Sequence, residues 1–448
     1  MSTLLLGDVT PEDREPISQA DLQGYFLEGA KPRSDWKVGA EFEQFALNRR
    51  TGCPITFAEP GGIRSILQSL VERYDWEPHF ERGQLTTLSR NGATVSLEPG
   101  GQVEFSTPPL DKLTDLKAEY TRYTNEIHSV VNPEDVAWVP AGVIPTCTVE
   151  EIALGVRRRH ALMAEYLPEH GPMALHMMKG TASTQVAFDY SDEADAMRKF
   201  AVALKLGPVV NAIWANSPVY NRRTTEWVSY RGCIWQGMDP ARSGMLVAQL
   251  QRGLSFQTWI DYLLDVPMLF HAIGGEFEHA HDCTFRNFMA NGIGGHFPSR
   301  LDWELHLTTV FPEVRMKHFL EVRGADANPL PLALAVPALW KGLLYNPGAL
   351  EAAMGFARQF LPEELPGVCE SAYRHGLAAQ YRGKPLLNYA REIVEIAAAG
   401  LQDSDGRTFL DPVREVLERG MSPGGMWIAQ CRGRVQSVKE LLDHFETV

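Results

Sequence analysis

The stretch from Val95 to Ser106, VSLEPGGQVEFS, most constrains what this chain can fold into. Alternating apolar residues predict a β-strand, and the Pro-Gly-Gly interruption predicts a bulge or a close backbone approach within it. Glu98 and Glu104 are six residues apart and share strand parity if the interruption leaves that parity unchanged. Because burying unpaired carboxylates is costly, the two acids either lie on a solvated face or serve a binding site.

A second predicted strand, Trp36–Leu47, carries two further acids in the sequence WKVGAEFEQFAL. Alternation places Glu41 and Glu43 on one face with Phe45, and smaller or apolar residues on the other face. Carboxylates two residues apart on a strand are separated by about 6–7 Å. They can therefore ligate one hard cation, or two neighbouring cations, through oxygen.

The segment Ser299–Arg323 predicts a strand, a Phe-Pro turn and a second strand, His318–Arg323. On this second strand Glu321 and Arg323 share a face, an arrangement that is also found in surface ion pairs of little energetic value. Five strand-borne acids in one cavity would repel one another unless cations filled it. Oxygen ligands without a cluster of His or Cys favour Mg²⁺ or Mn²⁺ over Zn²⁺.

The remaining pattern predicts a β-rich part with inserted helices, followed by helices from residue 332 onward. Thr86–Arg90 and Thr94–Phe105 predict a hairpin turned at Asn91-Gly92. The Gly-rich surroundings of Phe285–Met289 predict a loop. Helices are expected at Ser18–Leu27, Gly62–Tyr74, Leu110–Val131, Gly155–Tyr166, Asp192–Asn211, Ser255–Leu264, Leu350–Phe360, Leu386–Leu401, Pro412–Arg419 and Val435–Glu446.

Composition excludes several classes of protein. A net charge of −14 without a basic patch argues against nucleic-acid binding, and no segment approaches the roughly 20 apolar residues of a membrane span. Six scattered cysteines without CxxC pairs favour free thiols. The first residues lack a basic region and a cleavage pattern, so we expect a cytoplasmic chain.

No Walker A loop or GxGxxG fingerprint is present, so any ATP would be held by metals and arginines. Magnesium held by carboxylates and by substrate phosphates is the usual arrangement for nucleotide chemistry. The candidate phosphate partners are Arg323 together with one or more of Arg157–Arg159, Arg231 and Arg286. The run at Arg157–Arg159 is also consistent with a solvated helix face.

Seven motifs in order give the chain a family resemblance. The motifs are VGAEFEQFAL, VSLEPGGQVEFS, TASTQVAFDYSDEADAMRKF, ANSPVY, SYRGCIW, TFRNFM and TTVFPEVRMKHFLEVRGAD. With these motifs the chain resembles the plant-type (family 2) glutamate–cysteine ligases, which include many bacterial members and the related actinobacterial enzyme that begins ergothioneine synthesis. The resemblance covers about residues 36–345 and, more loosely, the helical tail.

The resemblance implies an α+β fold similar to the catalytic domain of glutamine synthetase, with a curved, mainly antiparallel sheet whose acidic face binds ATP and magnesium. Residues 1–345 would form this catalytic core, and residues 346–448 a helical segment packed on it. The subunit is expected as a monomer or a homodimer that acts on small molecules.

The implied reaction is ATP-dependent. ATP phosphorylates the γ-carboxylate of glutamate, and the amine of cysteine then attacks the acyl phosphate. Carried over by motif, Glu321 and Arg323 would be catalytic, with Arg323 stabilising the phosphoryl group. Gln185 and Arg286 would join Arg323 in binding ATP, and Gln185, Lys179 and Arg231 would bind substrate, Arg231 through a glutamate carboxylate. The metal ligands would be Glu41, Glu43, Glu98, Glu104 and Glu321.

Two positions depart from the family pattern. Many members carry an arginine where this chain has Gly180, and that arginine helps to bind glutamate; Lys179 or one of Arg157–Arg159 is expected to replace its charge. Ala187 stands where an asparagine is usual. Two alternatives therefore stay open: a related ligase that joins glutamate or a similar acid to another amine, and a non-catalytic member that binds nucleotide or amino acid.

Overall fold

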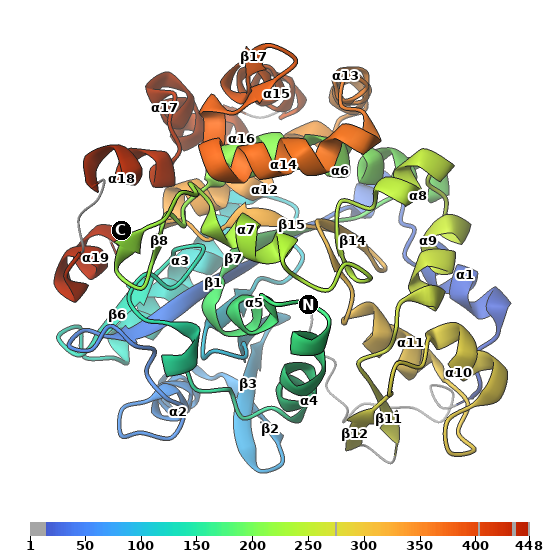
Figure 1. The fold of residues 1–448 in the computed structure, drawn as a ribbon, viewed down its shortest axis with the longest axis horizontal. Coiled ribbons are helices and arrows are strands. Elements are labelled where there is room, and N and C mark those ends of the chain that lie inside the picture. The colour runs from blue at the N-terminus through green and yellow to red at the C-terminus, as the bar shows by residue number, and fades with distance from the viewer. Residues whose placement is uncertain (1–14, 274–275, 402–403, 432–435, 447–448) are drawn as a thin grey trace.

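The computed structural model describes residues 15–273, 276–401, 404–431 and 436–446. Its centre is a nine-stranded sheet with the order β14-β15-β7-β1-β5-β4-β3-β2, and β6 pairs with β1 as well (Figure 1). Every pairing in this sheet is antiparallel. The strands are β1 (Val38–Asn48), β2 (Glu77–Glu81), β3 (Gln84–Arg90), β4 (Ala93–Leu97), β5 (Val103–Ser106), β6 (Val136–Val139), β7 (Ser183–Phe188), β14 (Val314–Met316) and β15 (Leu320–Asp326).

Helices surround the sheet, and pairs of short strands extend some of the loops. The helices are α1 (Gln19–Glu28), α2 (Ile63–Tyr74), α3 (Leu113–Ser129), α4 (Arg158–Tyr166), α5 (Ala174–Gly180), α6 (Glu193–Trp214), α7 (Tyr230–Gln236), α8 (Val247–Arg252), α9 (Phe256–Asp265), α10 (Phe285–Asn291), α11 (Arg300–Leu307), α12 (Leu330–Tyr345), α13 (Pro347–Ala357), α14 (Leu365–His375), α15 (Leu386–Gly400), α16 (Ser404–Thr408), α17 (Asp411–Arg419), α18 (Pro423–Cys431) and α19 (Val438–Phe445). The short pairs are β8 (Val219–Tyr220) with β9 (Arg223–Thr224), β10 (Ser243–Gly244) with β13 (Phe311–Pro312), β11 (Phe270–Ile273) with β12 (Glu276–His279), and β16 (Gln380–Tyr381) with β17 (Lys384–Pro385).

One face of the sheet is apolar and is covered by α2, α3, α6 and α12. The alternate residues of β1 that include Phe42 belong to this core, together with side chains of all four helices. Phe42 stacks on Tyr120 of α3 with ring centroids 3.9 Å apart, and Phe105 of β5 stacks on Tyr123 at 4.2 Å. Since side chains alternate along a strand, the residues between these apolar positions must face the opposite side.

The predicted strand Val95–Ser106 is in fact two strands. β4 and β5 pair with each other, with Leu97 opposite Val103, and the Pro-Gly-Gly sequence forms the turn between them. A Cβ at Gly100 would lie 2.1 Å from the backbone oxygen of Lys179, so only glycine allows this close approach to α5. Glu98 therefore lies in the turn and not on a strand.

Two other expectations are wrong. Ser299 begins helix α11 instead of a strand, because Ser299 and Asp302 form a capping box around its first turn. Phe285–Met289 lies in helix α10, whose N-cap Thr284 accepts a hydrogen bond from the backbone N–H of Asn287, and not in a loop. The hairpin turned at Asn91-Gly92 is confirmed. The helix expected at Ser18–Leu27 is α1, and Ser18 is its N-cap.

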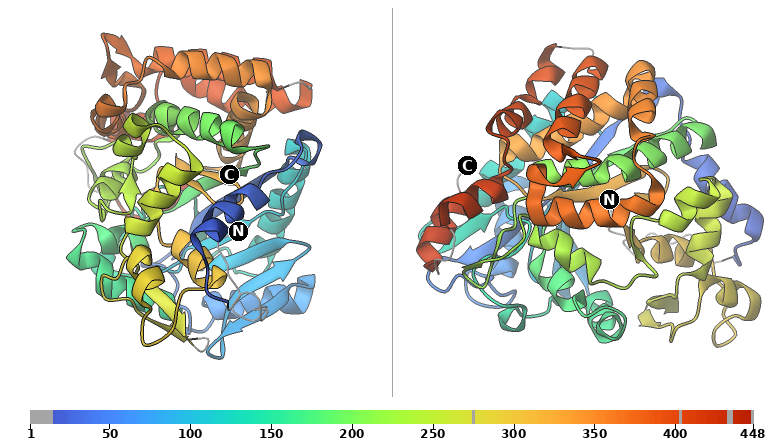
Figure 2. Two further views of the ribbon diagram at one scale, coloured as in Figure 1. Left: turned by 90° about the vertical axis from the view of Figure 1, so that its right-hand side faces the viewer. Right: turned by 45° about the horizontal axis from the view of Figure 1, so that its top comes forward.

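The C-terminal helices gather on one side of the molecule, with α6 between several of them and the sheet (Figure 2). α13, α14 and α15 contact α6, which contacts β15 in turn. One continuous apolar core includes side chains from both sides of residue 345. The α+β class with an antiparallel sheet and a helical C-terminal part is therefore confirmed. The six cysteines are free. Within the described residues, no helix is both long and apolar enough to span a bilayer.

Candidate active site

The sheet face opposite the apolar core carries a cluster of carboxylates, which we call the acid cluster: Glu41, Glu43, Glu98 and Glu104. On β1, Glu43 lies directly opposite Glu104 of β5, and Glu41 lies opposite Gln185 of β7. Like charges in directly opposed positions repel each other. The register of three neighbouring strands thus brings together acids that are far apart in the sequence.

Burial and mutual repulsion raise the pKa values of Glu43 and Glu104. Burial, and then the neighbouring charge of Glu98, raise the pKa of Glu43 to about 7. Burial and the charges of Glu41, Glu98 and Glu43 raise the pKa of Glu104 well above its usual value. Neutral donors only partly compensate, since Glu104 accepts hydrogen bonds from the hydroxyls of Ser96 (3.1 Å) and Ser106 (3.3 Å).

The turn that carries Glu98 is held in place by Gln102. The Gln102 amide donates to the carbonyl oxygens of Met178 (3.2 Å) and Thr181 (2.8 Å) and accepts from the backbone N–H of Gly100 (2.8 Å). Because the segment around α5 also packs on this turn, Glu98 is positioned against the acids of β1 and β5.

A cluster of cations borders the acids around Glu321 of β15, and we call it the cationic cluster. Arg315 of β14 donates to both carboxylate oxygens of Glu321, from Nε at 2.8 Å and from Nη2 at 3.0 Å. Arg323 donates to one oxygen at 2.8 Å, and Lys317 Nζ lies 3.7 Å from the other. Burial alone would raise the pKa of Glu321, but the three cations hold it well below its usual value.

Arg323 joins the two clusters. A bulge in the pairing of β15 with β7, between Val322 and Ala325, places Arg323 and Gly324 outside the regular ladder. One Arg323 nitrogen donates to both Glu321 and the Gln185 oxygen, and the Gln185 amide donates to Glu43 at 2.8 Å. A polar chain therefore runs from the cationic cluster through Arg323 and Gln185 to the acid cluster.

Arg231 lies at the same bulge. From helix α7 it donates to the carbonyl oxygens of Gly324 and Arg323, both at 3.0 Å, and it lies 3.8 Å from Asp326. It is 5% exposed. The guanidinium is thus fixed beside Arg323, and its Nε–H has no acceptor among the described residues.

Other predicted residues lie elsewhere. The Lys179 ammonium donates to the carbonyl oxygen of Ile152 at 2.8 Å, and burial lowers its pKa. Arg286 pairs on the surface with Asp265 at 2.7 Å, so the structure does not bring it to either cluster. Of the run Arg157–Arg159, Arg157 pairs with Glu81 at 3.2 Å. Burial and the neighbouring Arg157 lower the pKa of Arg159 to about 10, against the attraction of Glu98 and Glu104.

Sequence reasoning missed Arg315 and Lys317. Arg315 lies on β14 and Lys317 begins the true hairpin turn between β14 and β15, whereas the sequence pattern predicts the turn at the Phe-Pro dipeptide. Arg315 lies directly opposite Glu321. The alternation of VRMK, with apolar residues between the two cations, is the signal that could have identified them as partners of Glu321.

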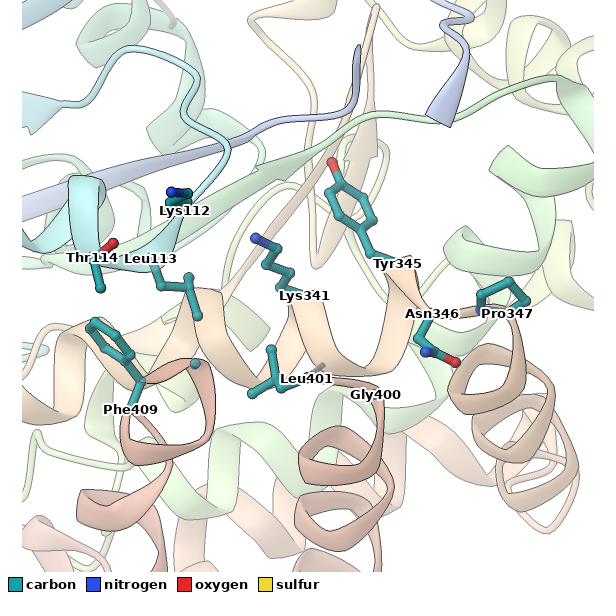
Figure 3. Close-up of a pocket in the computed structure, with 11 residues that line it drawn as sticks. Lys112, Leu113, Thr114, Lys341, Tyr345, Asn346, Pro347, Gly400, Leu401 and Phe409 are labelled. Carbon is teal, nitrogen blue, oxygen red and sulfur yellow. The ribbon is translucent and has the colours of Figure 1, made fainter. Parts of the chain in front are cut away.

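Two cavities differ in their surroundings. One of about 180 Å³ is lined by Arg231 and Arg323 and therefore adjoins the cationic cluster. Another of about 260 Å³ lies between α3, α12 and the C-terminal helices, on the side of the sheet that these helices cover (Figure 3). Lys341 and Tyr345 of α12 line this second cavity, and no carboxylate does. Of these two cavities, only the first adjoins the clusters.

The donors of the acid cluster suit a hard cation in kind, because they are carboxylates, and burial and mutual repulsion raise the pKa values of two of them, Glu43 and Glu104. As they stand, no three His, Cys, Asp or Glu side chains within the described ranges are close enough together to hold a metal ion. A bound cation would have to draw the carboxylates inward.

The raised pKa of Glu43 predicts how stability depends on pH without metal. Its folded pKa of about 7 exceeds an unfolded value near 4.3, so the folded state holds the extra proton between these values. The contribution of Glu43 to the free energy of unfolding is fully present below about pH 4.3, and it is lost as the pH rises through 7. We expect Tm in EDTA to fall between about pH 6.5 and pH 8, a range in which buried histidines contribute little. Glu43→Gln should flatten this change; an equal fall in the variant would refute the assignment.

Comparisons with known proteins place the chain in a family. The model of the glutamate-cysteine ligase family 2 (GCS2) matches residues 37–440. The chloroplastic glutamate–cysteine ligase of Solanum lycopersicum is 34% identical over 426 residues, which cover 94% of this chain and 81% of that protein. The chloroplastic enzyme of Arabidopsis thaliana is 34% identical over 424 residues, with 94% and 81% covered.

The fold has a solved counterpart. The glutamate–cysteine ligase of Francisella tularensis, crystallised in complex with AMP, superposes with a TM-score of 0.57 at 13% identity, covering 92% of this chain and 87% of that chain. The names of the plant relatives contradict the expectation of a cytoplasmic chain, since those enzymes are chloroplastic. That expectation relied on residues 1–14, which lie outside the described part, and on composition, which does not specify a cellular compartment. The chain belongs to glutamate–cysteine ligase family 2.

Proposed function

We propose that this protein joins the γ-carboxylate of glutamate to the amine of cysteine, using ATP and passing through γ-glutamyl phosphate. The observation that carries the proposal is the contact between the acid cluster and the cationic cluster through Gln185 and Arg323 on one sheet face. Phosphoryl transfer needs this pairing, because cations must offset the negative charge of the transferring group while carboxylates hold the metals.

In this proposal Glu41, Glu43, Glu98 and Glu104 hold Mg²⁺, or Mn²⁺, which would neutralise charge on the transferring phosphoryl group. Glu321 belongs to the predicted metal set as well. Its oxygens already accept from Arg315 and Arg323, so its first effect is to hold these guanidinium groups in place. Arg323 then presents fixed donors to the phosphoryl oxygens.

Arg231 is proposed to hold a carboxylate of glutamate. The cavity of about 180 Å³ beside it is of the size of a small amino acid, and both Arg231 and Arg323 line it. One end of the substrate would thus meet Arg231 while the γ-carboxylate approaches Arg323. The charge of the arginine missing at Gly180 would come from Arg159, whose guanidinium is attracted by the charges of Glu98 and Glu104.

An ADP-release assay tests the proposal, with glutamate compared with aspartate and other carboxylate analogues, each run against a panel of amines. We expect glutamate and cysteine to give the highest kcat/KM. Equal turnover of glutamate and its analogues would defeat the assignment. A different preferred amine would identify the related ligase, and no ADP release with any pair would identify a non-catalytic member. The expectation of a monomer or homodimer stays a prediction for sedimentation measurements.

Lys179→Ala is expected to leave kcat/KM for glutamate within about twofold, because the ammonium donates to the Ile152 carbonyl and not to the clusters. The same assay measures it, with Arg159→Ala for comparison. Losing a charge-assisted contact in Arg159→Ala should cost about 10- to 100-fold in kcat/KM. A large loss in Lys179→Ala alone would show that Lys179 supplies the missing charge after all.

A further inference from the structure

The cavity beside Arg231 holds both signs of charge. Arg231 and Arg323 line it with one carboxylate, Glu313, from the link between β13 and β14. The remaining wall is mostly apolar and includes Trp235 and Phe311. A cavity with two guanidinium groups and a carboxylate matches a zwitterion that carries more than one carboxylate.

Glu313 is held by neutral groups. Its Oε1 accepts from the Tyr373 hydroxyl at 2.9 Å, and its Oε2 accepts from the Asn211 side-chain amide at 3.4 Å. Across the part of the chain that the structure describes, no Lys, Arg or His lies within ion-pair distance of it. The carboxylate is therefore oriented without being neutralised, and its charge is available to a ligand.

Glu313 and Arg231 meet at the β15 bulge. Arg231 Nη1 donates to the carbonyl oxygen of Gly324 at 3.0 Å. A Cβ at the same glycine would lie 2.5 Å from Glu313 Oε2, so the carboxylate packs directly on this backbone. Glu313 and Arg231 thus lie on either side of Gly324. A single α-amino acid can reach both of them, with its ammonium at Glu313 and its α-carboxylate at Arg231.

The two arginines already have anionic neighbours, because Arg231 lies 3.8 Å from Asp326 and Arg323 donates to Glu321. Glu313 has none. In a partly apolar cavity, an ammonium beside Glu313 would form a charge-assisted hydrogen bond that is stronger than in water. The distribution of charges in the cavity therefore favours a bound cation beside Glu313.

We propose that Glu313 binds the α-ammonium of the acid substrate and so selects an α-amino dicarboxylate over a plain dicarboxylate. This inference rests on the proposed function. The acid substrate is the better occupant, since its α-ammonium takes no part in bond formation. The amine of the second substrate must be deprotonated to attack, and a neighbouring carboxylate would favour its protonated form.

Tyr373 extends the assignment to the C-terminal helices. It lies on α14 and orients Glu313, so the helical C-terminal part contributes to substrate selection from outside the sheet. Tyr373 is a positioning residue, because it acts through Glu313.

The test compares kcat/KM for glutamate with kcat/KM for glutarate, which lacks only the amino group. Glu313→Gln should lower the glutamate-to-glutarate ratio by about 10- to 100-fold, the value of one charge-assisted hydrogen bond. The ratio is measured within one preparation, so it does not depend on the fraction of folded enzyme. Glu77→Gln, an exposed residue of β2, is the matched control and should keep the wild-type ratio.

An unchanged ratio in Glu313→Gln, with both substrates slowed equally, would overturn the assignment and leave Glu313 a structural role. If that variant fails to fold, Glu313→Asp answers the same question, because it withdraws the carboxylate by one methylene and should also lower the ratio. An unchanged glutamate-to-glutarate ratio in Glu313→Asp would overturn the assignment as well. Failure of the wild type to use glutamate at all would instead refute the proposed function.

Discussion

Replacing Arg323 by lysine is expected to lower kcat by about 10²- to 10³-fold while KM for ATP changes far less. One Arg323 nitrogen is occupied by Glu321 and Gln185, so the rest of the guanidinium remains for a phosphoryl group. A lysine ammonium cannot hold both protein partners and present a planar pair of donors at the same time. Steady-state kinetics with ATP varied at saturating glutamate and amine measure the effect.

Arg286→Lys is the matched control. Arg286 pairs with Asp265 on the surface, and the same substitution there should leave both kcat and KM for ATP unchanged. If Arg323→Lys kept the wild-type kcat, Arg323 would serve only as an ion-pair partner of Glu321. If Arg286→Lys lowered kcat comparably, Arg286 would have to be assigned to ATP binding despite its position on the surface.

Glu104→Gln is expected to reduce turnover by at least about 10²-fold without lowering Tm in metal-free buffer. The carboxylate is buried, its pKa is raised by burial and by three neighbouring acids, and its hydrogen-bond partners within the described part of the chain are the hydroxyls of Ser96 and Ser106. Removing its charge relieves repulsion, so the apo fold should gain stability or keep it. What the variant loses is a ligand for the cation.

Glu126→Gln provides the opposite case. Glu126 is also a buried glutamate, but it accepts hydrogen bonds from Trp76 (3.0 Å) and Arg90 (2.9 Å). Its replacement should cost about 1–3 kcal/mol of stability and leave kcat per folded molecule unchanged. Thermal unfolding and turnover are measured on both variants. Loss of Tm with retained activity in Glu104→Gln would make Glu104 a structural residue like Glu126.

Short-range patterns were sufficient to predict much of the acid cluster. Alternation along β1 correctly placed Glu41 and Glu43 opposite the apolar positions, because the period of a strand is a local property. The pattern around Glu98 and Glu104 was read as one strand, although the two arms pair as a hairpin. Both readings bring the acids to the same region, so the error in topology did not mislead the choice of residues.

Turn positions and helix caps were the weak point. The turn between β14 and β15 was placed too early, and Ser299 was assigned to a strand although its capping box starts α11. As a result Arg315 and Lys317, which surround Glu321, were not recognised. A shift of a few residues in a turn changes which side chains face each other across a hairpin.

The sequence by itself determined the family, the antiparallel α+β class and the acidic strand face, because these follow from motifs and from side-chain periodicity. Only the tertiary structure decided which other cations meet these acids: Arg315 binds Glu321, whereas Lys179 donates to Ile152 and Arg286 pairs on the surface. It also decided that Tyr373 reaches Glu313 from 60 residues away along the chain. Such contacts depend on how helices pack on the sheet, and no local periodicity encodes that packing.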